Sequence, residues 1–104
     1  MKIALHQNDG LATLTPEGGI DERAAEALRL RFEELDAASI KELTFDFRHV
    51  DFIGSAGISK MILIYKLLTG YGRRKMRVVN VSPIVFELLS IVKLDTLFDV
   101  SAAR

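Results

Sequence analysis

The chain has 104 residues, 49% of them apolar, and fourteen basic residues balance fourteen acidic ones. A chain of this size holds one hydrophobic core, so we expect a single domain spanning residues 1–104. The zero net charge argues against binding to nucleic acid, and the absence of cysteine excludes disulfides, thiolate zinc sites and cysteine nucleophiles.

A β-hairpin is predicted at the N-terminus. Residues 2–6 and 11–15 alternate partly between apolar and polar side chains, and Asn8-Asp9-Gly10 stands between them. Asparagine and glycine tolerate the positive φ angles that tight hairpin turns require. Pro16 to Gly19 then break the strand pattern.

A first helix is predicted from Asp21, as its N-cap, to about Ala38. Its apolar residues recur every three or four positions, as expected for a helix with one buried face. These residues are Ala24, Ala25, Leu28, Phe32 and Leu35.

The rest of the chain alternates strands and helices. Strands are predicted at residues 43–47 and 77–81, and helices at 55–69, closed by Gly70, and at 83–90, capped by Ser82. Residues 94–100 are expected to add a short turn and an edge strand. This order predicts an α/β fold, a mixed β-sheet layered with helices.

Ser55 is the residue with the strongest functional signal. It follows Phe52-Ile53-Gly54 and begins a strongly apolar helix. The free N–H groups and the positive dipole end of such a helix favour an oxyanion or a phosphate. Serine is also a preferred N-cap, and local physics leaves both interpretations open.

The sequence does not favour enzymatic activity. Gly54-Ser55-Ala56-Gly57 is not the Gly-x-Ser-x-Gly nucleophile elbow, and a serine nucleophile would also need an oriented histidine. His6 and His49 are the two histidines, and no phosphate-binding loop is present. We therefore expect no catalytic residues, no metal site and no cofactor.

The second helix has two faces that differ in character. At about 100° per residue, its predicted core face comprises Ile58, Met61, Tyr65 and Leu68. The opposite face comprises Ser59, Leu63 and Leu67, flanked by Lys60 and Lys66. This second face either binds a partner or is covered by neighbouring helices. The basic cluster Arg73-Arg74-Lys75 with Arg77 is either a solvated connection or a contact for an acidic partner.

Three segments resemble the STAS family, which is named for sulfate transporters and anti-sigma factor antagonists. Gly18-Gly19-Ile20-Asp21 resembles the family's Gly-Glu-Leu-Asp segment, and residues 43–58 resemble its central strand and its Phe-Ile-Asp-Ser-Ser-Gly signature. Residues 79–83, with Leu88, Leu89 and Leu94, resemble its later strand and helix. The resemblance spans nearly the whole chain and implies a single STAS-like domain.

The resemblance also implies a phosphorylation switch. In anti-sigma factor antagonists the first serine of the signature, here Ser55, is phosphorylated by a partner that is both anti-sigma factor and serine kinase. The unphosphorylated form binds this partner and the phosphorylated form releases it. The surroundings of the expected site are Asp21, Asp46, Gly54, Ala56 and Gly57. Two of them depart from the signature, because Gly54 replaces the aspartate and Ala56 the second serine.

The sequence therefore predicts a phosphoprotein that regulates transcription through protein–protein interaction. The expected contact is the face formed by Ser59, Lys60, Leu63, Lys66 and Leu67. A different class of function is a constitutive STAS subunit of a lipid-transport machinery or a signalling scaffold, without phosphorylation control. A phosphatase partner and homo-oligomer formation stay open. No apolar run has the length of a signal peptide or a membrane span, so we expect a cytoplasmic protein without membrane insertion.

Overall fold

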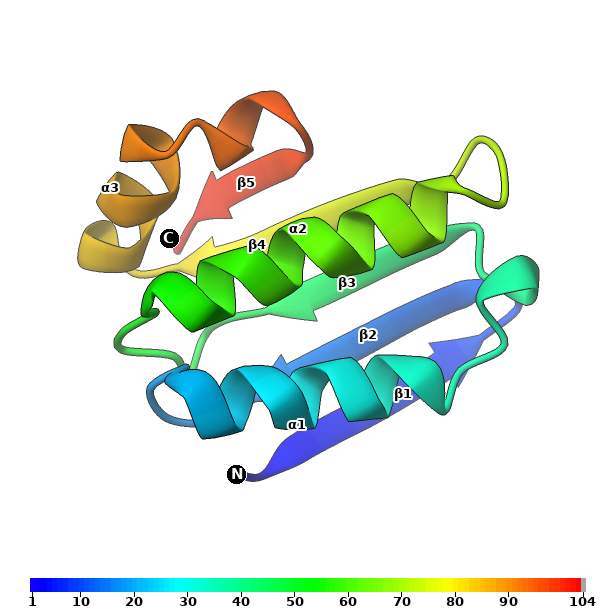
Figure 1. The fold of residues 1–104 in the computed structure, drawn as a ribbon, viewed down its shortest axis with the longest axis horizontal. Helices are drawn as coiled ribbons and strands as arrows, with labels where there is room; N and C mark the ends of the chain where they lie inside the picture. The colour runs from blue at the N-terminus through cyan, green and yellow to red at the C-terminus, as the bar shows by residue number, and fades with distance from the viewer. Residues whose placement is uncertain (104) are drawn as a thin grey trace.

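The computed structural model describes residues 1–103, which form a five-stranded sheet with helices packed on one face (Figure 1). The strands are β1 (Ile3–Asn8), β2 (Leu11–Pro16), β3 (Glu42–Asp46), β4 (Lys75–Val81) and β5 (Asp99–Ala102). The α-helices are α1 (Glu22–Glu33), α2 (Ser55–Thr69) and α3 (Pro83–Ile91), and two short 3₁₀ turns are η1 (Ala37–Ser39) and η2 (Leu94–Thr96). The mixed α/β architecture predicted from the sequence is confirmed.

The sheet has the strand order β1-β2-β3-β4-β5. The strands β1 and β2 are antiparallel, and every later neighbour is parallel. The predicted hairpin turn is confirmed, because Asp9 and Gly10 both have positive φ angles, of 47° and 84°. Two such residues in a two-residue loop match the right-handed twist of the flanking strands.

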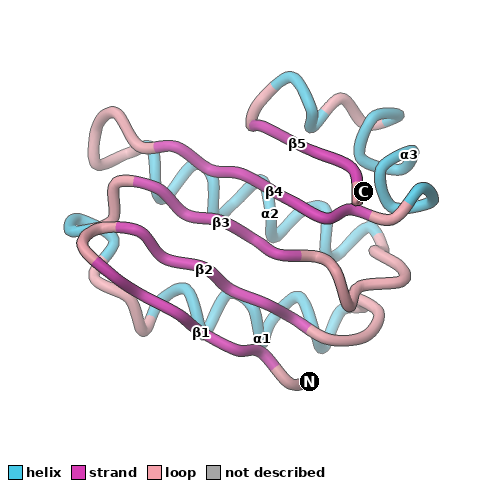
Figure 2. Tube along the Cα trace, turned by 180° about the vertical axis from the view of Figure 1, so that it is seen from behind, coloured by secondary structure: helices cyan, strands magenta, loops and turns pink. Residues whose placement is uncertain are grey.

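The helices α1 and α2 lie side by side over one face of the sheet, and the view from behind shows the strands uncovered (Figure 2). The sheet alternates accordingly: Leu43 and Phe45 of β3 are buried beneath the helices, whereas Thr44 between them is only half-buried. Phe45 and Phe47 pack edge to face with ring centroids 6.2 Å apart. The core therefore lies between the sheet and the two helices.

The first helix ends at Glu33, so the prediction that it reaches about Ala38 is wrong. Leu35 is buried behind its last turn, and Asp36 adopts an extended backbone with ψ of 93° before η1 begins. The Ser39 hydroxyl donates to the Asp36 carbonyl, a local bond that competes with a continuing helix. The periodicity extended past this point because Leu35 is a core residue outside the helix.

The C-terminal elements match their predicted types. Ser82 caps α3, and its hydroxyl accepts a hydrogen bond from the Val85 N–H at 3.4 Å. The turn η2 leads into β5, which pairs with β4 at the edge of the sheet. Phe98, at this turn, packs against Tyr65 of α2 with ring centroids 5.7 Å apart. This contact joins the C-terminal segment to the rest of the core.

Candidate functional site

Two loops meet at the N-terminus of α2, one following β2 and the other following β3. The Ile20 N–H donates to the Phe52 carbonyl at 2.8 Å, and the Gly54 N–H donates back to the Ile20 carbonyl at 2.9 Å. The Gly18 N–H also donates to the His49 carbonyl at 2.8 Å. These bonds extend the parallel pairing beyond the strands, so the backbone that leads into Ser55 is held in place.

Ser55 is exposed and is the first residue of α2. Gly54, with φ of −92°, is the N-cap, so the interpretation of Ser55 as an N-cap is wrong. The physical reason is that glycine supplies the extended cap conformation one residue earlier, which makes Ser55 the first residue inside the helix. The Ser55 hydroxyl is therefore not used in capping.

The N-terminus of α2 differs from those of the other α-helices among residues 1–103. The Asp21 carboxylate caps α1 by accepting from the Ala24 N–H at 2.9 Å, and Ser82 caps α3. No side chain caps α2, and its first turn holds no acidic residue. Its first N–H groups and its positive dipole end are therefore not offset by a side chain, and they favour an anionic group there.

Gly57 sits where α2 approaches the paired loops most closely. A Cβ atom at this position would lie 2.7 Å from Ile53 Cγ1 and 2.8 Å from Ile20 Cγ2. Only glycine allows this approach without displacing the two isoleucines. Gly54, in contrast, has room for a Cβ, with the nearest atom 3.6 Å away.

The two carboxylates predicted near the site have other contacts. Asp21 caps α1, as stated above, and Asp46 lies on the helix-free side of β3 because Phe45 before it points into the core. Asp46 accepts from Asn80 Nδ2 at 3.0 Å and from Arg48 Nε at 2.9 Å. Partial burial acts to raise the pKa of Asp46, but these hydrogen bonds outweigh it and the pKa is lowered. Among residues 1–103, no hydrogen bond joins either carboxylate to Ser55.

The outer face of α2 remains partly open. Leu63 is 37% and Leu67 41% exposed, and Ser59 and Lys66 are also exposed. Lys60 is half-buried, with Nζ 3.3 Å from Glu26 Oε2 of α1. Glu26 also binds Arg29, whose guanidinium lowers the pKa of Glu26 to about 2. Lys60 therefore helps to join the two helices.

The core face of α2 was predicted in part. Met61 and Leu68 are buried as expected, whereas Ile58 and Tyr65 are half-buried and Ile64 is fully buried. Ile64 was missed because the buried face, which also includes Gly57, is rotated by about 50°, half a residue step, from the predicted face. Leu63 and Leu67 nevertheless lie outside the core, as predicted.

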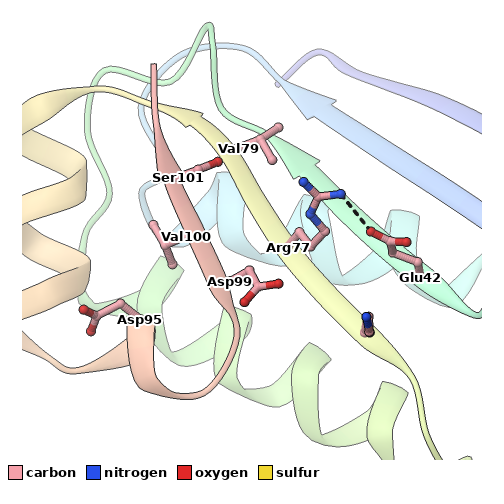
Figure 3. A pocket seen from close by; sticks show the side chains of 8 residues that line it. Glu42, Arg77, Val79, Asp95, Asp99, Val100 and Ser101 are labelled. Atoms are coloured by element: carbon pink, nitrogen blue, oxygen red, sulfur yellow. Dashed lines mark hydrogen bonds and ion pairs between the residues drawn. The ribbon is translucent and has the colours of Figure 1, made fainter. Parts of the chain in front are cut away.

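Two residues of the basic cluster, Arg74 and Arg77, are engaged within the chain, and Arg73 and Lys75 are exposed. Arg74 donates to the Ala38 carbonyl at 2.9 Å, and Arg77 binds Glu42 at 3.0 Å across two strands. Arg77 and Glu42 line a shallow hollow of about 570 Å³ on the helix-free face of the sheet (Figure 3). Glu42 neutralises Arg77 in this hollow, and Lys75, Asp95 and Asp99 add charged side chains of both signs to its lining.

Phe52 was missed as a site residue. Its side chain is 52% exposed, whereas Val50 and Ile53 in the same loop are buried. Two glycines near Phe52 are the signal that could have identified it. Gly54 follows it by two residues, and Gly19 lies beside it in the paired loop.

A comparison with known protein families identifies the family of this chain. The sequence profile of the STAS domain matches residues 2–103. The chain belongs to the STAS domain family. Among proteins of curated function, none matches the sequence significantly. Within residues 1–103, no helix is long and apolar enough to cross a membrane, and no cluster of three His, Asp or Glu side chains could hold a metal ion.

Several solved STAS-like structures are similar to this chain. An anti-sigma factor antagonist from Mycobacterium paratuberculosis is 25% identical, with a TM-score of 0.84, over 96% of this chain and 84% of that one. A putative anti-sigma factor antagonist from Thermotoga maritima is 18% identical, with a TM-score of 0.85, over 95% and 85%. The Bacillus cell fate determinant SpoIIAA in its phosphorylated form is 16% identical, with a TM-score of 0.72, over 95% and 90%. At these identities the last two show a shared fold.

Proposed function

We propose that this STAS protein is an anti-sigma factor antagonist that binds a kinase-type anti-sigma factor and is switched off by phosphorylation at Ser55. The observation that carries the proposal is the exposed Ser55 at the start of α2, a helix whose N-terminus is not capped by a side chain. The similarity to the Mycobacterium paratuberculosis antagonist supports the partner class. In this role the protein is a cytoplasmic substrate of the kinase and catalyses nothing itself.

The N-terminus of α2 suits a reversible phosphate. A phosphoserine carries a charge of about −1.5 to −2 at neutral pH, and the free N–H groups of the first turn and the helix dipole stabilise that charge. The same charge has to be desolvated if a partner covers the loop. Phosphorylation therefore leaves the fold intact and weakens docking.

The proposed contact surface is the outer face of α2 together with the Ser55 loop. It comprises Ser59, Lys60, Leu63, Lys66 and Leu67. Leu63 and Leu67 supply apolar area, and Lys66 supplies an exposed cation at its border. Because the helix begins at Ser55, one partner can cover both the serine and the first exposed turns of α2.

The test compares Ser55→Ala and Ser55→Asp with the wild type in binding to each kinase-type anti-sigma factor of the host, purified separately. The alanine variant should bind and accept no phosphate, and the aspartate variant should bind more weakly. Ser101→Asp is the matched control, since it places the same charge on an exposed serine of β5. Equal weakening by Ser55→Asp and Ser101→Asp would contradict the proposal, as would full phosphorylation of Ser55→Ala.

A second candidate is a constitutive subunit of a larger complex, such as a lipid-transport machinery or a signalling scaffold. The observation that favours it is the replacement of the signature aspartate by Gly54 and of the second serine by Ala56. The two candidates use the same surface and differ in whether Ser55 carries phosphate in the host. Mass spectrometry of the protein isolated from cells with and without the kinase distinguishes them.

A further inference from the structure

Phe52 presents an aromatic side chain beside the candidate switch. It lies three residues before Ser55 and is 52% exposed, although most large apolar side chains around it are buried. Ile53 and Ile20, which flank it in the paired loops, are 1% and 0% exposed. A half-exposed phenylalanine forfeits much of the stabilisation that its burial would give, and that apolar area stays available to a partner.

The loop holds this ring in a fixed place. The Phe52 carbonyl accepts from the Ile20 N–H, and the Gly54 N–H donates to the Ile20 carbonyl, so the backbone is bonded on both sides of Ile53. The ring lies over Gly54, where an added Cβ would be 3.6 Å from Phe52 Cε2. An aromatic side chain with a fixed backbone loses little entropy when a partner covers it.

Gly54 places no charged side chain on the side of the ring that faces Ser55. An aspartate, which the family signature has at this position, would put a hydrated carboxylate beside the ring. Desolvating such a group would oppose apolar contact at the loop. The replacement of the signature aspartate therefore leaves the ring without a charged neighbour at position 54, while Asp51 before the ring is exposed.

We propose that Phe52 is the apolar anchor through which the kinase-type anti-sigma factor reads the state of Ser55. This inference rests on the proposed function and adds its mechanism. The partner would receive the ring in an apolar socket, and a phosphate on Ser55 would bring charge and bound water to the edge of that contact. Release then follows from loss of the Phe52 contact rather than from repulsion at a remote charge.

The experiment is a double-mutant cycle measured by calorimetric titration with each kinase-type anti-sigma factor of the host, purified separately. The variants are Phe52→Ala, Ser55→Asp and the double variant. Leu11→Ala is the matched control, because Leu11 is 53% exposed and lies at the start of β2, away from the loop. Phe52→Leu retains apolar bulk and serves as a conservative variant.

Phe52→Ala should weaken binding by about 30-fold or more, the size typical of a central anchor. Leu11→Ala should change it less than about twofold, and Phe52→Leu should keep most of the affinity. Ser55→Asp should add less than about threefold in the Phe52→Ala background, although it is much more damaging alone. All variants should melt within a few degrees of the wild type.

The possible failures differ from one another. If the wild type binds and Ser55→Asp releases it, but Phe52→Ala binds normally or the two effects multiply, the role of Phe52 is refuted while the proposed function stands. If the wild type binds none of the kinases, both are refuted. A large drop in melting temperature for Phe52→Ala and Phe52→Leu alike would show that the ring supports the fold and would also overturn the inference.

Discussion

Asp46 shows how one carboxylate can serve the fold at the edge of a site. Asn80 has a left-handed backbone with φ of 57°, a conformation that asparagine tolerates better than most residues. Its side-chain amide donates to Asp46, which also accepts from Arg48. These contacts join the ends of β3 and β4 on the helix-free face. Asp46 therefore stabilises the end of β3, which leads into the loop before Ser55.

Replacing this carboxylate should produce a pH-dependent loss of stability. The pKa of Asp46 in the folded protein lies below the ordinary pKa of an aspartate. The carboxylate therefore contributes its full stabilisation at any pH above the ordinary pKa. This stabilisation is lost as the pH falls through the folded pKa. Asp46→Ala should reduce the free energy of unfolding by about 1–2 kcal/mol at pH 7. In urea denaturation, the difference from the wild type should shrink as the pH falls from about 4, the ordinary pKa of an aspartate, downwards. A difference that is constant over this range would refute the role of the charge.

The helix α2 packs closely against the paired loops at Gly57, and the sequence alone predicted only part of this arrangement. Small residues at its start indicated a site, but the structure shows that Gly57 also has a packing role against Ile20 and Ile53. The direction of the helix, and hence the exposure of Ser55, depends on that contact. Gly57 therefore contributes both to packing in the core and to the position of the surface at which a partner is proposed to bind.

Gly57→Ala should destabilise the protein by about 1–3 kcal/mol through overpacking. The matched control is Gly54→Ala, whose added Cβ meets atoms no closer than 3.6 Å and which should change stability by less than about 1 kcal/mol. Thermal and urea unfolding measure both variants. Equal stability of the two would show that α2 can shift away from the paired loops without a penalty.

Leu63→Arg tests the outer face of α2. Leu63 is 37% exposed, so an arginine can extend into solvent and the free energy of unfolding should change by less than about 1 kcal/mol. Binding to the kinase-type anti-sigma factor should weaken by about 2 kcal/mol or more if this leucine is central to the contact. A much lower melting temperature would place Leu63 in the core, and normal binding by a stable variant would remove it from the interface.

At the scale of the whole molecule, local patterns predicted the elements and left their relative orientation unspecified. Turn residues, caps and periodicity located the hairpin, α2 with both its ends, and the Ser82 cap, because each is determined by neighbouring residues. The burial of Ile64, the end of α1 and the position of Asp46 depend on which elements pack together. Phe52 belongs to the same class, since its exposure follows from the pairing of two loops that are distant in sequence.

Phosphorylation at Ser55 is the central element of the proposed function. The direct measurement is peptide mass spectrometry of the wild type and Ser55→Ala after incubation with ATP and each kinase-type anti-sigma factor of the host. We predict one phosphate on the peptide that contains Ser55 in the wild type, and none on Ser55→Ala. Phosphate on another residue, or equal phosphate on Ser55→Ala, would contradict the account.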